Sequence, residues 1–370
     1  MNSPPSRFIA LDMFRGLAIA LMILVNTPGD WGHVYRPLLH SNWHGLTPTD
    51  IVFPCFLFIV GASIFFAYSP TGFVLSRAAA SKVVKRSAIM FAIGLGLNVY
   101  NAVLLDLDSI RIMGVLQRIS ICYFFAAMLL LWCRISTVYW VSGVTLTAYF
   151  LLFIVFGGQS PFAFENNIVG SIDRAILGQA HMWKMHGVAF DPEGLISTAP
   201  ATVTLLMGFE AARRFRFASS SYVALRQLMI AGFGLLVIGY LSSWLMPINK
   251  NLWSVSFVFS CGGFAILTLA ACLYLSDIKK IRLVSQGLRI YGTNPLLIYC
   301  LSWLMATAFM AIKIDAFGAS NSESLYTFLW RLLLPIMSPE LASLVFALAH
   351  VLLFWLVAAL FYRRGLILKI

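Results

Sequence analysis

The sequence contains few charged residues. Only 11% of its 370 residues are Asp, Glu, Lys or Arg, and 60% are hydrophobic. A soluble domain carries about 25% charged and about 45–50% apolar residues, so this chain cannot cover a water-facing surface with polar side chains. Its apolar runs are continuous, whereas the strands of a membrane barrel alternate polar and apolar residues. The composition therefore predicts an all-α protein, a polytopic bundle of transmembrane helices.

The sequence also lacks the cysteine patterns of disulfide-rich or zinc-binding folds. Its six cysteines lie within or at the ends of apolar runs, and no two form a Cys-x-x-Cys pair. Neither a disulfide framework nor a zinc site is indicated, and we expect no metal cofactor. The first apolar run follows Arg7 without a small-residue cleavage site, so we expect a retained helix there rather than a signal peptide.

The net charge of +12 would suggest a nucleic-acid partner in a soluble protein. In a membrane protein, Lys and Arg gather in the cytoplasmic loops, which explains the excess here. We therefore expect membrane lipids, and no nucleic acid, around this chain.

About ten apolar runs have the length of a membrane span, which needs about 20 residues. They are residues 8–25, 51–68, 87–105, 112–132, 138–156, 195–212, 228–246, 252–275, 290–312 and 341–362. The run 325–337 is too short to span, and we expect it to be interfacial or re-entrant. No repeat or linker divides the chain, so we expect residues 1–370 to form a single transmembrane domain.

The basic connections between these runs set the orientation. With the N-terminus in the cytoplasm, the connections near Lys85, Arg134, Arg213, Lys280 and Arg363 all fall on the cytoplasmic side, as the positive-inside rule requires. Both termini are then cytoplasmic. Three polar, aromatic-rich segments share the opposite side: residues 26–54, 157–194 and 247–251.

Two arginines lie inside predicted spans, where ionisable residues are costly and mark function by default. Arg15 is three residues from Asp12, and the two could simply pair. Arg118 has no acid nearby in sequence, so it needs a partner in space or binds an anion. Together with Lys85 and Arg86 in a basic connection, these arginines suit an anionic ligand arriving from the cytoplasm, although the positive-inside bias alone explains the residues of the connection.

The polar segment 26–54 holds the best candidates for catalysis. It contains His33, His40 and His44, and we favour His40 as a general base because an unperturbed histidine titrates near pH ~6.5. The spacing of the three histidines matches no zinc signature. Asn26, at the end of the first span, could donate to a developing oxyanion. Asp50 could cap the second span or orient a histidine.

Two other outer segments offer groups for binding a polar substrate. Asp191 and Glu193 lie among aromatic residues and suit a hydroxylated or amino-bearing ligand, although Asp-Pro-Glu-Gly is also typical of a turn. The loop INKNLW adds Asn249 and Lys250, and we expect its Trp253 to be an interface anchor.

Several stretches taken together resemble the heparan-α-glucosaminide N-acetyltransferase family of polytopic transmembrane acetyltransferases. In chain order they are LDMFRGLAIALMILVN, HSNWHGLTPTDIVFPCFLFIVGASI, RIMGVLQRIS, DPEGLIST, NKNLWSVSF and GTNPLLIY. The LDxxRG motif alone also resembles other membrane acyltransferases, but the combination is specific and covers nearly the whole chain.

The resemblance implies transfer of the acetyl group of cytosolic acetyl-CoA to an amino sugar across the membrane. The family's essential histidine, in a His-x-x-Trp-x-Gly motif, corresponds to His40 here, followed by Trp43, and the family's asparagine corresponds to Asn26. His44 stands where the lysosomal enzyme has asparagine. That enzyme also carries a further N-terminal segment, so we expect free glucosamine or a short amino sugar, rather than heparan, as the acceptor.

These expectations combine into one hypothesis. CoA phosphates would bind Arg15, Arg118, Lys85 and Arg86, and the amine would attack the thioester beside His40, directly or through an acetyl-histidine. We expect a bacterial inner-membrane enzyme, with a homodimer as one option for its assembly. An amino-sugar transporter fits the spans equally well but does not need the His40–Asn26 pair. A cell-envelope glycan O-acyltransferase shares the LDxxRG start but not the loop motif.

Overall fold

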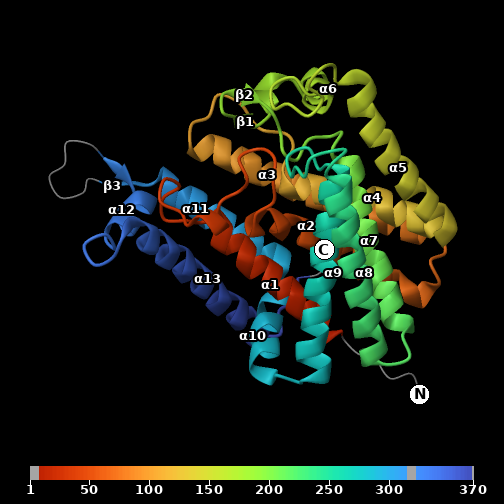
Figure 1. The fold of residues 1–370 in the computed structure, drawn as a ribbon. Coiled ribbons are helices and arrows are strands. Elements are labelled where there is room, and N and C mark those ends of the chain that lie inside the picture. Colours follow the sequence, from red (N-terminus) through yellow and green to blue (C-terminus); the bar gives the residue numbers. More distant parts are fainter. Residues whose placement is uncertain (1–7, 315–321, 369–370) are drawn as a thin grey trace. The chain divides into compact units, whose positions relative to one another are not determined.

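The computed structural model describes residues 8–314 and 322–368, and these residues are mostly helical (Figure 1). The α-helices are α1 (Ile9–Asn26), α2 (Pro48–Tyr68), α3 (Arg77–Leu104), α4 (Val115–Trp132), α5 (Ile135–Phe156), α6 (Ile168–Leu177), α7 (Thr198–Phe217), α8 (Ser221–Ser242), α9 (Val255–Leu273), α10 (Arg282–Gly292), α11 (Pro295–Ala311), α12 (Leu325–Arg331) and α13 (Pro339–Arg363). Single turns of 3₁₀-helix cover Arg36–Leu38, Ser69–Thr71 and Gln179–His181, and a π-helical turn, Tyr274–Ile278, follows α9.

Strands are confined to two short antiparallel pairs in the described part of the chain. β1 (Lys184–Met185) pairs with β2 (Val188–Ala189), and β3 (Lys313–Ile314) pairs with β4 (Glu323–Ser324). The prediction of an all-α membrane protein is confirmed.

Each predicted span coincides with a helix or helix pair. By length and hydropathy, eight of the described helices could each cross a membrane, and a ninth candidate is the pair α10–α11, bent by 69°. The predicted count of ten differs by α7, which is absent from this set because Glu210, Arg213, Arg214 and Arg216 lie inside the helix. The 325–337 run forms only the seven-residue α12, and its predicted interfacial or re-entrant place stays a prediction.

The basic connection before the third span is helical, which corrects the prediction of a loop there. α3 begins at Arg77, so Lys85 and Arg86 are on a helix. Ser76 caps its start by accepting a hydrogen bond from the amide of Ala79 at 3.1 Å, and the following alanines favour helix strongly.

The chain forms two compact units. The first contains the chain up to His40, Thr47–Phe53 and the chain from Thr268; the second contains Ser41–Leu46 and Pro54–Leu267. The divisions at Pro54 and Thr268 fall inside α2 and α9.

In the first unit, α1 packs on α10, with α11 and α13 beside it (Figure 1). The contact is close because both helices present glycine. A Cβ on Gly16 would lie 1.8 Å from the carbonyl oxygen of Leu288, and one on Gly292 would lie 2.1 Å from that of Asp12. Gly16, the glycine of the LDMFRG motif, therefore allows the backbones of α1 and α10 to approach this closely.

The bend between α10 and α11 is held by Asn294. Its Nδ2 donates to the carbonyl of Leu366 at 2.8 Å, and its Oδ1 accepts from the amide of Leu368 at 2.9 Å. Pro295, with no amide hydrogen to donate, opens α11. Asn294 thus ties the break in the helix to the segment after α13.

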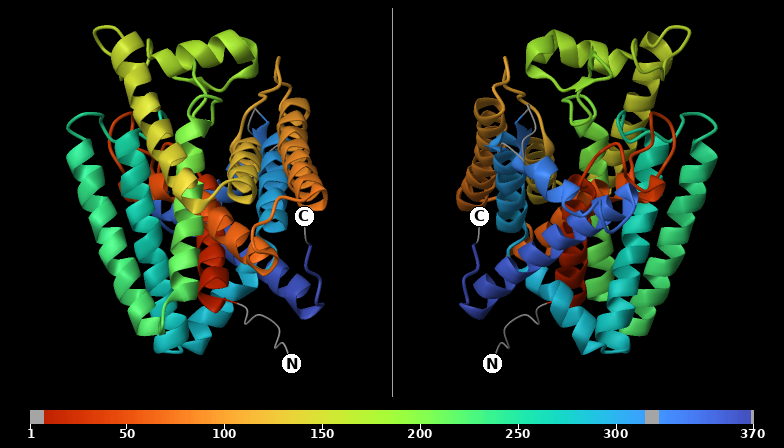
Figure 2. Two further views of the ribbon diagram at one scale, coloured as in Figure 1. Left: turned by 90° about the vertical axis from the view of Figure 1, so that its right-hand side faces the viewer. Right: turned by 90° about the vertical axis from the view of Figure 1, so that its left-hand side faces the viewer.

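In the second unit, α3 and α4 form an antiparallel pair, and α7 packs against α4, α5 and α8 (Figure 2). α2 crosses α7 at two glycines: a Cβ on Gly61 would lie 1.7 Å from the carbonyl of Leu205, and one on Gly208 would lie 1.8 Å from that of Phe58.

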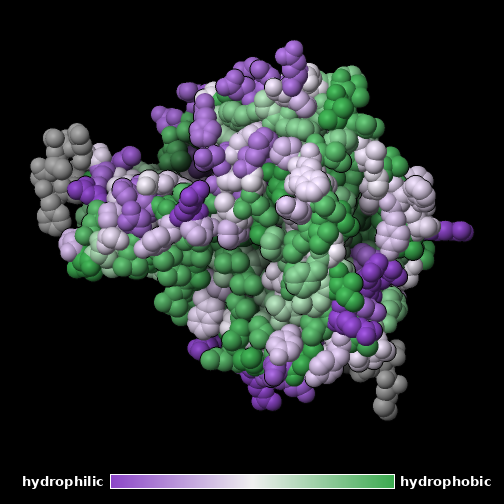
Figure 3. Space-filling model, in the orientation of Figure 1, coloured by the Kyte–Doolittle hydropathy of each residue, from purple (hydrophilic) through white to green (hydrophobic). Residues whose placement is uncertain are grey.

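Hydrophobic side chains cover much of the molecular face in Figure 3. α5 and α8 are the clearest cases among the described helices, because only 22% of each spanning window is buried and residues such as Trp140, Val144, Ile230 and Val237 are exposed. Such surfaces are expected to face lipid.

Candidate active site

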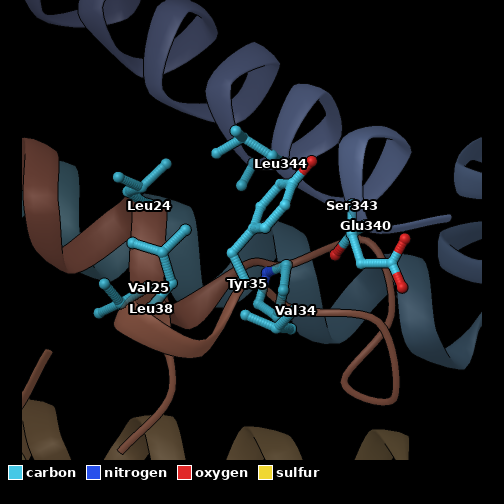
Figure 4. Close-up of a pocket in the computed structure, with 10 residues that line it drawn as sticks. Leu24, Val25, Val34, Tyr35, Leu38, Glu340, Ser343 and Leu344 are labelled. Carbon is cyan, nitrogen blue, oxygen red and sulfur yellow. The ribbon is translucent and has the colours of Figure 1, made fainter. Parts of the chain in front are cut away.

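The first residues of the α1–α2 loop (residues 27–47) are hydrogen-bonded to α12 and α13. The amide of Gly29 donates to the carbonyl of Ser343 at 3.3 Å, and the hydroxyl of Tyr326 donates to the carbonyl of Pro28 at 2.7 Å. Farther along, Tyr35 points toward α13 between Leu344 and Glu340 (Figure 4). These contacts hold the start of the loop to the first unit.

His33 takes part in this attachment. Its Nδ1 lies 2.6 Å from Oδ2 of Asp30, and its ring stacks on that of Trp330 with 5.8 Å between centroids. Asp30 is itself bound through its backbone to Ser343. His33 thus fastens the loop to α12.

His40 is paired with a buried carboxylate. Its Nδ1 lies 2.7 Å from Oδ1 of Asp50, whose side chain is 1% exposed while that of His40 is 44% exposed. The other oxygen of Asp50 accepts bonds from the amide and hydroxyl of Thr47, each at 3.0 Å. The sequence left a cap or a histidine partner as alternatives for Asp50, and the geometry shows the histidine partner. The N-cap of α2 is Thr47, whose hydroxyl accepts from the amide of Asp50 at 3.4 Å, and Asp50 is the third residue of the helix.

This pairing fixes the chemistry that His40 can perform. A carboxylate accepts hydrogen bonds, so Asp50 selects the imidazole tautomer with the proton on Nδ1 and the lone pair on Nε2. The carboxylate also stabilises the imidazolium that forms when Nε2 takes a proton, as in other His–Asp pairs. The pair can therefore act as an oriented general base.

Asn26 is the last residue of α1 and is exposed. It lines a small cavity of about 30 Å³ in the first unit, together with Tyr299 and Trp303 of α11. The cavity is large enough for a water-sized group. The predicted role of Asn26 as an oxyanion donor stays a prediction.

Trp43 and His44 belong to the second unit. Trp43 Nε1 donates to the carbonyl of Phe162 at 2.8 Å, and its ring meets those of Phe164 and Phe190 edge to face. Asn249 Nδ2 donates to Nδ1 of His44 at 3.2 Å, and burial lowers the pKa of His44. The predicted substrate roles of Trp43 and Asn249 remain predictions.

The loop that carries Asn249 is organised from within. Oδ1 of Asn249 accepts from the amide of Leu252 at 2.8 Å, and the carbonyl of Lys250 accepts from the amide of Trp253 at 3.0 Å. Trp253 is only 1% exposed, so the prediction that it anchors at the membrane interface is wrong: its ring lies under Arg118, and its Nε1 donates to Thr204 at 3.1 Å.

Arg111 binds the carboxylates of Asp191 and Glu193, and the sequence analysis did not identify it. It donates to Asp191 at 2.6 and 2.9 Å and to Glu193 at 2.5 Å, and it stacks over Trp183. Burial would raise the pKa of Asp191, but Arg111 outweighs it, and the pKa is lowered. The sequence feature that could have identified Arg111 is its position as the first residue of the motif RIMGVLQRIS. Its partners could not be identified in the same way, because they lie about 80 residues away.

Arg118 is completely buried, and its partners lie close behind Asp191 and Glu193 in the sequence. Its Nη2 donates to the carbonyl of Gly194 at 3.0 Å and to the hydroxyl of Ser197, at the start of α7, and its guanidinium lies 5.0 Å from the centroid of Trp253. Its Nε and Nη1 have no hydrogen-bond partner among the described residues. Arg118 therefore has partners within the fold, one of the two alternatives considered from the sequence, and its predicted contact with an anion stays a prediction.

The remaining candidates for CoA binding have separate surroundings. Arg15 donates to Asp12 at 2.8 Å, so the simple pairing considered from the sequence exists. Arg86 lies over the ring of Tyr123 at 4.8 Å, and Lys85 is exposed. Their predicted contact with CoA phosphates stays a prediction. Among the described residues, no group of three or more His, Cys, Asp or Glu is placed to hold a metal.

The family described as heparan-alpha-glucosaminide N-acetyltransferase, catalytic, matches residues 7–167, which include Asn26, His40 and Asp50. The human heparan-alpha-glucosaminide N-acetyltransferase is 29% identical over 364 residues, covering 81% of this chain and 53% of the human protein. The mouse protein is 29% identical over 362 residues, covering 80% and 53%. The chain thus spans about half the length of the curated relatives it matches. The resemblance read from the motifs is confirmed.

Proposed function

Because this chain is a relative of heparan-alpha-glucosaminide N-acetyltransferase along about four-fifths of its length, we propose that it is a membrane-embedded N-acetyltransferase. It moves the acetyl group of acetyl-CoA to the amino group of a glucosamine-type sugar. The observation that carries the proposal is the 2.7 Å pair between His40 and the buried Asp50, located in the segment that matches the family.

The pair supplies the proton transfers that acetyl transfer requires. The sugar amine attacks the thioester carbon, and His40 Nε2 takes the proton that the nitrogen loses as the C–N bond forms. The C–S bond breaks, and the CoA thiolate takes the proton from the imidazolium, which Asp50 has stabilised. The products are the N-acetyl sugar and CoA, with His40 neutral again. Asn26 donates to the oxyanion of the tetrahedral intermediate.

The outer carboxylates contribute through Arg111 in this proposal. Asp191 and Glu193 are held by its guanidinium, so they shape the acceptor site as a fixed network. Glu193, with 12% of its side chain exposed, is the member that reaches the acceptor. Trp43, Asn249 and Lys250 complete the polar surface that we assign to the sugar.

The donor arrives from the opposite side of the membrane. Lys85 and Arg86 lie in the first half of α3, in the basic segment that the positive-inside rule assigns to the cytoplasm, and they attract the CoA phosphates. We assign Arg15 and Arg118, each inside a predicted span, to further contacts with the anionic donor. The acceptor is then periplasmic, in a bacterial inner membrane.

The test uses purified protein, labelled acetyl-CoA and glucosamine. We expect label on the sugar nitrogen with wild type, and none with His40→Ala although CoA still binds. Normal turnover by the alanine variant would remove His40 from the mechanism. Wild type that transfers no acetyl but carries glucosamine into vesicles would show a transporter instead.

A further inference from the structure

A cavity of about 530 Å³ lies in the second unit between α5, α7, α8 and α9, and none of its lining residues belongs to the site assigned to acetyl transfer. This volume falls within the range of about 300–1,000 Å³ that is typical of ligand sites. The wall is mainly apolar, with side chains such as Leu146, Leu206, Leu235 and Phe259. Two of its four helices, α5 and α8, are those with the most exposed hydrophobic surface described above. The cavity therefore sits among helices that face lipid.

One end of the cavity is charged. Glu210 and Arg214 both line it, and Arg214 Nε lies 2.6 Å from Glu210 while 55% of the arginine side chain is exposed. Arg213 also binds Glu210, at 2.7 Å, and Arg216 follows on the same helix. Three arginines against one glutamate leave an excess of positive charge at this end of α7.

Small residues keep the apolar part of the cavity open. Gly143 of α5 and Gly234 of α8 both line it, and a Cβ added to either would meet no atom within 4 Å. A larger side chain at these positions would occupy the cavity without striking its walls. The two glycines therefore offer a direct way to fill it.

We propose that this cavity binds one acyl chain of an anionic phospholipid, with the lipid phosphate held by Arg214. An occupant that matches the site must be apolar along most of its length and negatively charged at one end. Arginine binds phosphate with two parallel hydrogen bonds, and basic residues at the membrane surface select anionic lipids.

The site lies outside the acetyl-transfer machinery, so it can be tested without acetyl-CoA. The protein is placed in nanodiscs with equimolar phosphatidylglycerol and phosphatidylcholine, released into mild detergent, and weighed by native mass spectrometry. We expect wild type to retain one phosphatidylglycerol per chain, preferred over phosphatidylcholine by about tenfold or more.

The double variant Gly143→Leu/Gly234→Leu tests the cavity itself. Both positions are exposed and leucine favours helix more than glycine does, so the variant folds. We expect it to lose the retained lipid. Gly96→Leu is the matched control, because Gly96 is also exposed on a helix, α3, with no atom within 4 Å of an added Cβ; it should retain lipid like wild type.

Arg214→Gln tests the phosphate contact. Glu210 keeps Arg213 as a partner, so the helix stays intact, and we expect retained lipid with no preference for phosphatidylglycerol. The proposal fails if the double variant retains as much phosphatidylglycerol as wild type, or if wild type does not distinguish the two lipids. It also fails if the double variant changes the fraction of dimer and leaves lipid retention unchanged, since the cavity would then be a contact between copies.

Discussion

Replacing His40 by alanine should abolish acetyl transfer, and the α1–α2 loop provides its own control. His33 is paired with Asp30 at 2.6 Å, much as His40 is paired with Asp50 at 2.7 Å, and the two histidine side chains are 43% and 44% exposed. The carboxylates differ: that of Asp30 is 38% exposed and that of Asp50 is 1% exposed. Water screens the first pair much more than the second.

The size of the effect follows from the chemistry of the pair. A positioned general base contributes about 10²- to 10⁴-fold, which His40→Ala removes. Asp50→Asn removes the carboxylate charge beside the imidazolium. Two charges about 4 Å apart interact by about 4 kcal/mol at an effective dielectric constant near 20, or roughly 10³-fold in rate. Asparagine still accepts the hydrogen bond from Thr47, so the cap on α2 is kept and stability changes little.

The assay is the rate of labelled acetyl transfer to glucosamine, per folded molecule, for the variants at His40 and Asp50 and for His33→Ala and Asp30→Asn. We expect a large fall in kcat for the first two variants and rates near wild type for the second two. Equal losses at His33 and His40 would show that the loop needs its histidines only for shape. Activity of His40→Ala within tenfold of wild type, below the range given above for a general base, would refute the catalytic assignment.

Three further predictions concern stability. Arg111→Met leaves the buried carboxylates of Asp191 and Glu193 without their partner, and it should lower the free energy of unfolding by about 3–5 kcal/mol. The melting temperature should fall, and neutralising both carboxylates in the same variant should restore it. Burial raises the pKa of Asp173 from its ordinary value to about 6, so its ionisation opposes folding, and this cost in stability grows as the pH rises from about 4 to about 6. Above pH ~6, Asp173→Asn should stabilise the fold by up to about 3 kcal/mol, which is measured as a higher melting temperature. The same gain at pH ~4, where the carboxyl is protonated, would contradict this explanation. Gly16→Ala places a Cβ against the backbone of α10 and should cost about 1–3 kcal/mol or more, whereas Gly287→Ala, with no atom within 4 Å of the added Cβ, should not lower the melting temperature.

The helices could be predicted closely because their signal is local. A run of apolar residues marks a span wherever it lies, and the ends of α1, α4 and α5 fall within three residues of the predicted ends. The errors have local causes too. Charges were taken to end a helix at Lys85 and Arg86, although α3 continues through both, and α7 reads as apolar only when its arginine-rich end is left out.

The site could be predicted only as a set of candidates. The motif pointed to His40, yet three histidines share the loop, and their surroundings depend on distant residues: Trp330 for His33, Asn249 for His44. The hydrogen bonds of Arg111 could not be predicted, because side-chain hydrogen bonds between distant residues produce no periodic pattern in the sequence. The partners of Arg111 follow about 80 residues later.

The amino-acid sequence was enough to predict a helical membrane protein and the polar residues that it must accommodate, because both follow from the order of apolar and charged side chains along the chain. Only the three-dimensional structure shows that the carboxylate of Asp50 is buried beside His40, whereas that of Asp30 is partly exposed to solvent. Burial depends on what the rest of the chain packs around a group, and burial sets how strongly a carboxylate acts on its histidine.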